Sequence, residues 1–135
     1  MAEATLERSV CFRATHHYHR TQWSPEKNRA TFGPLEDPHP HDWVVTVRVR
    51  GTLDAYGFVL DLAVLDRLLG KVLGVLDGVD LNEAIPEMGS GHLQPSTEAL
   101  ARWVWGQLAA QIPEPACLVR VRVAEGTGLA AEYDG

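Results

Sequence analysis

The arrangement of this chain is decided by one stretch, residues 36–49, which reads EDPHPHDWVVTVRV. His39 and His41 stand two positions apart in it, just before a run in which valines alternate with polar residues. Such a run indicates a β-strand with one covered face. Side chains two positions apart on a strand point to the same face, so we expect both imidazoles to converge on one spot. The alternative interpretation is a loop that carries two solvated histidines.

A third histidine, His16, is placed to join this pair. Residues 9–15 (SVCFRAT) predict a first strand whose apolar residues lie on one face, and His16 continues that face. Imidazole is the commonest side-chain metal ligand, and three protein ligands with an open fourth position form a catalytic zinc site. We therefore predict that His16, His39 and His41 bind Zn2+.

The composition is that of an ordinary globular protein. The chain has 135 residues, 45% hydrophobic and 22% charged, so we expect a single domain over 1–135. A net charge of −6 argues against nucleic acid or an anionic membrane as partner. Neither a membrane-spanning apolar run nor a signal-peptide core is present, so we expect a soluble cytoplasmic protein. In that compartment Cys11 and Cys117 are expected to be two buried thiols.

Two apolar stripes at helical spacing predict two helices. The first stripe follows Asp61, a candidate N-cap, and the second follows a cap at Ser96 or Thr97. Their expected buried residues are Leu62, Leu65, Leu69, Val72, Leu73 and Leu76 in the first helix, and Leu100, Val104, Leu108 and Ile112 in the second. Residues 20–38 show no sustained periodicity, which predicts a long functional loop before the second strand.

Two further strands complete the expected fold. Residues 118–125 alternate in the strand pattern, and residues 129–133 predict a short last strand. The order strand, strand, helix, helix, strand, strand indicates an α+β fold, with two helices on one face of a four-stranded antiparallel sheet. Glu125 ends its strand toward the covered face, where a carboxylate is costly unless it is paired or binds a ligand.

Six local motifs, taken in order, resemble the 6-pyruvoyltetrahydropterin synthase and 6-carboxytetrahydropterin synthase family. The resemblance covers the chain from about Val10 to Glu125. The matching segments are 12–16 (FRATH), 39–41 (HPH, with proline where the family has glycine), 57–62 (GFVLDL), 76–82 (LDGVDLN), 95–101 (PSTEALA) and Glu125. The resemblance implies a T-fold, whose subunits form barrels and commonly a homohexamer, a dimer of trimers, with active sites between subunits.

The same resemblance implies roles for the candidate site residues. It implies zinc on the three histidines, and a pterin substrate whose ring is held by Glu125 together with Thr97 and Glu98. A carboxylate suits that ring, because the ring's amino group and adjacent N–H present two donors in a row.

Two departures from the family pattern bear on the reaction. The family's catalytic cysteine is replaced by Leu35 and its partner histidine by Gly78, so that Asp77 alone remains of the expected trio. Glu36, three residues before His39, resembles a branch that carries Glu-x-x-His-Gly-His and makes 6-hydroxymethyldihydropterin for folate synthesis. We therefore predict a zinc-dependent lyase with Glu36 and Asp77 as catalytic residues. Its substrate would be 7,8-dihydroneopterin triphosphate or a close analogue, and its product 6-carboxytetrahydropterin or 6-hydroxymethyldihydropterin, for queuosine or folate biosynthesis.

Other interpretations stay open. The missing cysteine and histidine also fit a paralogue that binds zinc and a pterin or purine but turns over slowly or not at all. A non-catalytic oligomeric scaffold would keep only the fold. Glu36 could be a loop carboxylate in water, and His92 either a surface residue or a spatial substitute for the missing histidine.

Overall fold

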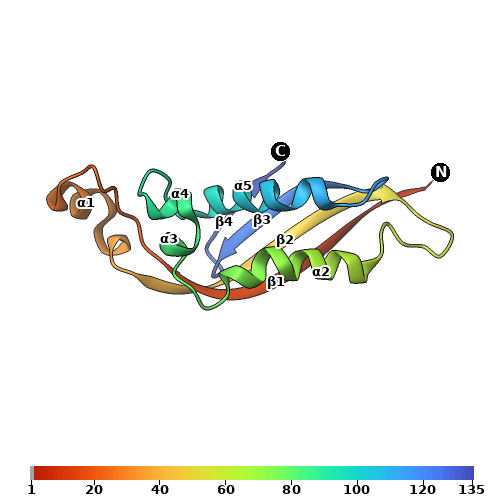
Figure 1. Ribbon diagram of the computed structural model, residues 1–135, viewed down its shortest axis with the longest axis horizontal. Helices are drawn as coiled ribbons and strands as arrows, with labels where there is room; N and C mark the ends of the chain where they lie inside the picture. The colour runs from red at the N-terminus through yellow and green to blue at the C-terminus, as the bar shows by residue number, and fades with distance from the viewer. Residues whose placement is uncertain (1) are drawn as a thin grey trace.

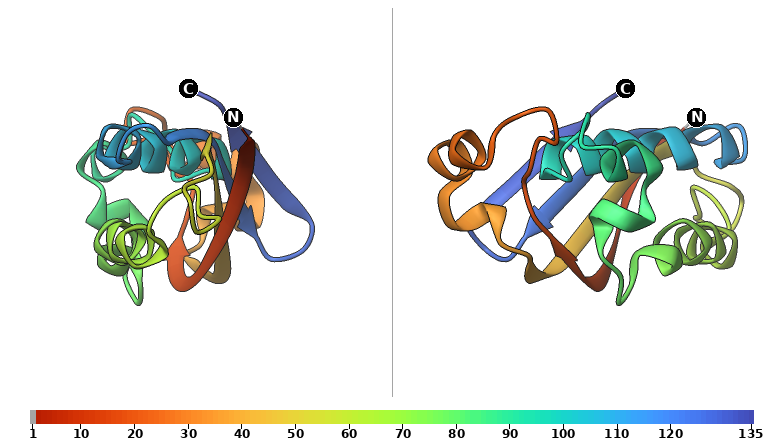
Figure 2. Two further views of the ribbon diagram at one scale, coloured as in Figure 1. Left: turned by 90° about the vertical axis from the view of Figure 1, so that its right-hand side faces the viewer. Right: turned by 60° about the vertical axis from the view of Figure 1, so that its left-hand side comes forward.

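The computed structural model describes residues 2–135 and shows a four-stranded antiparallel sheet covered on one face by helices (Figure 1). The strands, in spatial and chain order, are β1 (Glu3–His16), β2 (His39–Thr52), β3 (Cys117–Glu125) and β4 (Leu129–Tyr133). The two long helices, α2 (Leu62–Leu73) and α5 (Thr97–Leu108), lie side by side on the same face (Figure 2). The predicted α+β architecture is confirmed.

The first two strands are longer than the alternating patterns indicated. β1 and β2 pair without interruption over 14 residues each, from Glu3 opposite Thr52 to His16 opposite His39. The early part of β1 is too polar to stand out in the sequence, but its partner strand supplies a backbone hydrogen-bonding edge along its whole length. Because of this extension, the candidate ligands lie at the paired end of a hairpin rather than in a loop.

Both long helices begin where the capping residues predict. The Asp61 carboxylate accepts a hydrogen bond from the N–H of Ala63, and the Ser96 hydroxyl accepts one from the N–H of Ala99, so Ser96 rather than Thr97 is the cap. Of the ten residues expected to be buried, nine are buried. Leu62 is the exception, since it lies in the first turn and faces solvent.

Residues 20–38 are not the structureless loop that we expected. They contain the helix α1 (Pro25–Phe32) and the 3-10 helix η1 (Gly33–Glu36), which lie beyond the sheet at the end where β1 stops and β2 starts (Figure 1). α1 carries no apolar stripe, so its periodicity is weak. Its N-terminus is instead stabilised by the Ser24 hydroxyl, which caps the N–H of Lys27, and by the buried Asn28 amide, which donates to the carbonyl of Arg20.

Further short helices interrupt the connection between α2 and α5. They are η2 (Gly74–Leu76), α3 (Leu81–Ala84) and α4 (Pro86–Gly89), and η3 (Ala109–Gln111) follows α5. The segment after η2 is fastened to the edge of β1, where the N–H of Gly78 donates to the carbonyl of Arg13 and the N–H of Thr15 donates to the carbonyl of Val79. These bonds bring the chain back toward the end of β1.

The prediction of two buried thiols is wrong. Cys11 and Cys117 are both exposed, on strands that are separated by β2, so they are free and not paired. Cys11 alternates with buried Phe12 and so points to the face of the sheet that carries no helix. Within residues 2–135, none of the helices combines the length and apolar character needed to cross a bilayer.

Candidate metal and ligand site

The structure brings the three predicted histidines together at the end of the β1–β2 hairpin. The strand register sets His16 opposite His39 and Ala14 opposite His41, so all three imidazoles leave the sheet on the same face. One ligand atom of each ring lies within 4.8 Å of the other two. Their convergence follows the strand parity that the sequence indicated.

Hydrogen bonds to backbone carbonyls orient two of the three rings. Nδ1 of His16 donates to the carbonyl of Pro95 at 2.7 Å, and Nδ1 of His39 donates to the carbonyl of Asp37 at 2.6 Å. Each Nδ1 must carry the proton, since a carbonyl can only accept, and this leaves Nε2 with a free lone pair. The Nε2 atoms of His16, His39 and His41 are all buried, and none has a hydrogen-bond partner among the described residues.

The Trp43 ring packs against the histidine cluster. The Trp43 side chain is fully buried, its ring centre lies 4.9 Å from that of His16, and its indole N–H donates to the carbonyl of Ala14. The pKa of His16 is lowered to about 4, mainly by burial and in addition by the neighbouring His39 and His41, against the opposing effect of the Pro95 carbonyl. His16 is therefore neutral near pH 7, which is the form of imidazole that binds metal ions.

Glu125, at the end of β3, faces this cluster as its parity predicted. Its two carboxylate oxygens lie 3.4 Å from Nε2 of His16 and 3.8 Å from Nε2 of His41, and the side chain is only 12% exposed. Burial raises the pKa of Glu125 and the charge of Glu98 adds to the effect, while His41 and His39 oppose it. One of the oxygens of Glu125 also lacks a hydrogen-bond partner in the part of the chain that the structure describes.

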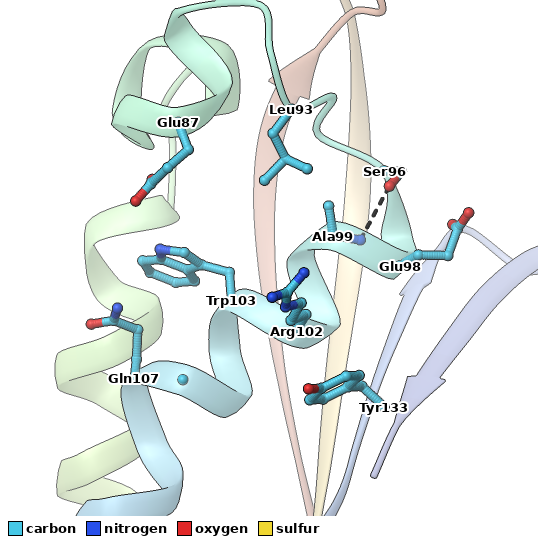
Figure 3. Close-up of a pocket in the computed structure, with 10 residues that line it drawn as sticks. Glu87, Leu93, Ser96, Glu98, Ala99, Arg102, Trp103, Gln107 and Tyr133 are labelled. Carbon is cyan, nitrogen blue, oxygen red and sulfur yellow. Dashed lines mark hydrogen bonds between the residues drawn. The ribbon is translucent and has the colours of Figure 1, made fainter. Parts of the chain in front are cut away.

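Thr97 and Glu98 stand at the start of α5, and the charge of Glu98 acts on Glu125. Thr97 is fully buried and its hydroxyl donates to Oε1 of Glu98 at 2.7 Å, whereas Glu98 itself is exposed. A hollow of about 740 Å3 adjoins them on α5, and Ser96 and Glu98 are among the residues that line it. Figure 3 shows Glu98 and Trp103 pointing to opposite sides of α5, and none of the three histidines is among the residues that line this hollow.

The two predicted catalytic carboxylates have different surroundings. Glu36 is 14% exposed and is held between Nδ1 of His19, at 3.1 Å, and Nε of Arg29, at 3.3 Å. Asp77 accepts a hydrogen bond from the backbone N–H of Arg13 at 3.1 Å, which helps to fasten the segment after η2 to β1. Among the described residues, no hydrogen bond or ion pair joins either carboxylate to His16, His39 or His41, and the structure gives Glu36 a histidine partner, His19, that the sequence did not predict.

Sequence reasoning also missed Tyr18. Its ring packs edge-on against His16, with 5.2 Å between ring centres, and it contacts Phe32 of α1 on its other side. Burial raises the pKa of Tyr18 to about 12, with contributions from the charges of Glu125 and Glu98. The one signal in the sequence was position, because Tyr18 stands two residues after His16. His92, by contrast, is exposed and bonds to Gln22 at 3.0 Å.

The buried His16 imidazole predicts a pH dependence of stability in metal-free protein. Its folded-state pKa of about 4 lies below the value near 6.5 of an unfolded histidine, so between these values the unfolded chain binds a proton that the folded chain does not. The free energy of unfolding should therefore rise from pH 4 to pH 6.5, by up to about 3 kcal/mol.

Urea unfolding in the presence of a chelator, at several pH values, measures this slope. Glu125 acts in the opposite sense, because a raised carboxyl pKa means that stability is lost as the pH rises through it. The Glu125→Gln variant removes that contribution and isolates the effect of His16. If the free energy of unfolding of this variant does not change between pH 4 and pH 6.5, His16 is not held neutral by burial.

Comparison with known proteins places this arrangement in a family. The family model for 6-pyruvoyl tetrahydropterin synthase matches residues 5–135. The chain is 30% identical to a 6-pyruvoyl tetrahydrobiopterin synthase of Poecilia reticulata, over 80% of this chain and 75% of that protein. It is 29% identical to the human enzyme of that name, over 98% of this chain and 92% of that protein. The solved Caenorhabditis elegans 6-pyruvoyl tetrahydropterin synthase superimposes with a TM-score of 0.90 at 28% identity, covering 100% of this chain and 97% of that one. The chain therefore belongs to the 6-pyruvoyl tetrahydropterin synthase family.

Proposed function

We propose that this protein is a zinc-dependent lyase acting on the side chain of 7,8-dihydroneopterin triphosphate or a close analogue. One observation carries the proposal: three buried imidazole Nε2 atoms converge within 4.8 Å without hydrogen-bond partners among residues 2–135. Buried nitrogen acceptors that are left unpaired are unfavourable, and a shared ion satisfies all three.

The residues present fit Zn2+. Three neutral imidazoles are a usual ligand set for catalytic zinc, and the carbonyls of Pro95 and Asp37 supply the outer hydrogen bonds that orient such ligands. When bound, zinc would act as a Lewis acid and lower the pKa of substrate hydroxyl groups. The family membership supports a pterin as the substrate class.

Glu125 would anchor the pterin ring. Its carboxylate lies next to the three histidines, on the inner face of the site, and burial leaves it short of hydrogen-bond donors. The ring's amino group and adjacent N–H would supply two donors in a bidentate arrangement. Thr97 and Glu98 line the same side, and we assign them to ring binding as well.

Glu36 would be the base, with His19 as its hydrogen-bonded partner. A carboxylate paired with imidazole at 3.1 Å can pass a proton onward, and burial at 14% exposure limits competition from water. A glutamate is described as the catalytic residue in solved variants of the Plasmodium vivax synthase, a protein that shares the fold at 19% identity. Asp77, which accepts a hydrogen bond from the N–H of Arg13 at the edge of β1, would be the second catalytic carboxylate.

A slow or inactive paralogue is the second candidate, and a specific contact favours it. Arg29 lies 3.3 Å from one oxygen of Glu36 and His19 lies 3.1 Å from the other, so both carboxylate oxygens already have partners within the chain. The positions where the family usually has its proton-transfer cysteine and histidine are occupied here by Leu35 and Gly78.

Product analysis separates the candidates. Purified protein with added zinc is incubated with 7,8-dihydroneopterin triphosphate, and the pterins are resolved by chromatography. A 6-hydroxymethyl or 6-carboxy product supports the lyase. Binding of zinc and pterin without product supports the paralogue, and failure to bind either supports the scaffold.

We also propose a cytoplasmic homo-oligomer, a hexamer formed as a dimer of trimers. β1 and β4 are the outer strands of the described sheet, and β4 and the early part of β1 each present a backbone edge that a second copy could pair with. The ligand site lies at one end of that sheet, where β1 ends and β2 begins. A solution mass equal to one chain would exclude this assembly.

Replacing Glu36 by glutamine should lower kcat by roughly 100-fold or more, because an amide cannot take up a proton, while its oxygen still accepts a hydrogen bond from His19. Zinc content should not change. Glu26→Gln, at an exposed position in the first turn of α1, is the matched control. A Glu36→Gln variant that keeps the wild-type rate would rule out Glu36 as the base.

A further inference from the structure

Arg29, in the last turn of α1, contacts both of the carboxylates that precede His39 in the chain. Its two terminal nitrogens donate to the two carboxylate oxygens of Asp37, at 3.2 and 3.0 Å. Its Nε lies 3.3 Å from Oε1 of Glu36, and one terminal nitrogen also donates to the carbonyl of Gly33 at 3.0 Å. A single guanidinium thus joins α1 to the turn that follows it, to the proposed base and to Asp37.

Asp37 connects this guanidinium to the histidine cluster. Its side chain binds Arg29, whereas its backbone carbonyl accepts the hydrogen bond from Nδ1 of His39 at 2.6 Å. The backbone N–H of Asp37 donates to the carbonyl of Pro34 at 3.1 Å, so Asp37 is held through its side chain, its N–H and its carbonyl. The direction of that carbonyl orients the ring of His39 and hence the lone pair on its Nε2.

The pair formed by Arg29 and Asp37 is too exposed to contribute much to the free energy of unfolding. The two side chains are 54% and 65% exposed, and exposed ion pairs add little to stability. A guanidinium that binds a carboxylate through two hydrogen bonds nevertheless fixes the direction of that carboxylate. The contact therefore restricts the geometry of Asp37 more than it stabilises the fold.

We propose that Arg29 is a positioning residue for the metal site, which acts through Asp37 to orient His39 and so sets the affinity of the cluster for Zn2+. The same guanidinium holds Glu36, so α1 positions the proposed base and a proposed zinc ligand together. α1 lies beyond the end of the sheet (Figure 1), and this contact gives it a role in supporting the site. The assignment rests on the proposed zinc site but not on turnover.

The test measures zinc affinity rather than catalysis. Wild type and variants are titrated with zinc in competition with a chelator of known affinity, at one fixed pH. Arg29→Gln removes the guanidinium, and Asp37→Ala removes the carboxylate but keeps the backbone carbonyl that His39 binds. Arg8→Gln is the matched control, because Arg8 donates two hydrogen bonds to the carboxylate of Asp66, both at 2.8 Å, and joins the middle of β1 to α2.

We expect Arg29→Gln and Asp37→Ala each to raise the Kd for zinc roughly tenfold, which is the low end of the effect of losing an outer partner of a metal ligand. Because the two residues act through one contact, the double variant should lose no more affinity than the weaker-binding single variant. Arg8→Gln should keep the wild-type Kd, although it loses an ion pair of the same kind.

The melting temperature of the metal-free proteins separates positioning from general destabilisation. Arg29→Gln should change it no more than Arg8→Gln does, since each removes a guanidinium from an exposed aspartate. A wild-type Kd for zinc in Arg29→Gln, an equal loss in Arg8→Gln, or fully additive losses in the double variant would each overturn the assignment.

Zinc binding by the wild type decides whether the assignment and the proposed function fail together. A wild-type protein that binds no zinc would overturn the assignment and would also remove the proposed metal site. If the wild type binds zinc without turnover and Arg29→Gln weakens that binding, the assignment stands and only the lyase activity fails.

Discussion

Replacing His39 by alanine is expected to abolish stoichiometric zinc binding and, with it, turnover. His39 contributes one of three convergent Nε2 atoms, and its orientation is set by the Asp37 carbonyl. Loss of an outer hydrogen bond to a metal ligand typically costs about 10–100-fold in affinity, and loss of the ligand itself should cost more. Metal analysis of protein dialysed against a measured free zinc concentration gives the change directly.

Thermal unfolding provides a second measurement of the same effect. A ligand that binds only the folded state stabilises it, by about 4 kcal/mol at a free concentration 1,000 times its Kd. Zinc should therefore raise the melting temperature of the wild type and have little effect on His39→Ala. His92→Ala is the matched control, because His92 is exposed and bonds to Gln22 outside the cluster. Wild-type zinc content in His39→Ala would contradict the three-histidine site.

Replacing Glu125 by glutamine should weaken pterin binding by about 100-fold, equivalent to about 3 kcal/mol. The amide keeps one acceptor but turns the other into a donor, which would face a donor of the ring. Two charge-assisted hydrogen bonds are replaced by one neutral bond and one repulsive contact. Fluorescence titration with pterin measures the loss.

Zinc content distinguishes a ring anchor from a metal ligand at this position. Glu125 lies 3.4 Å from Nε2 of His16, near enough that it could instead complete the coordination of the ion. A ring anchor requires that Glu125→Gln keep full zinc content. The metal-free variant should also be more stable at pH 7, because a buried carboxylate with a raised pKa is replaced by a neutral group. Glu132→Gln, exposed on β4, is the control, and loss of zinc together with pterin from Glu125→Gln would identify Glu125 as a ligand.

Features that depend on local periodicity were predictable from the sequence. Strand parity was sufficient to place His16, His39 and His41 on one face and to direct Glu125 inward. Helical spacing identified α2 and α5, and the capping residues placed their first turns. Where the periodic signal is weak, as in α1 and in the first residues of β1, the sequence analysis missed the element or shortened it. The parity of Cys11 was readable in the same way, but the expectation of a buried thiol overrode it.

The sequence by itself therefore determined the sheet, its two covering helices and the three imidazoles that meet at the end of the hairpin, because each depends on side-chain direction within one element or between paired strands. Only the tertiary structure decided what surrounds them. The carbonyl of Pro95 orients His16 from 79 residues away, His19 and Arg29 hold Glu36, and Phe32 of α1 packs against Tyr18. Such contacts join segments with no common period, so they exist only once the chain has folded and the packing of α1 and α5 has set the distances.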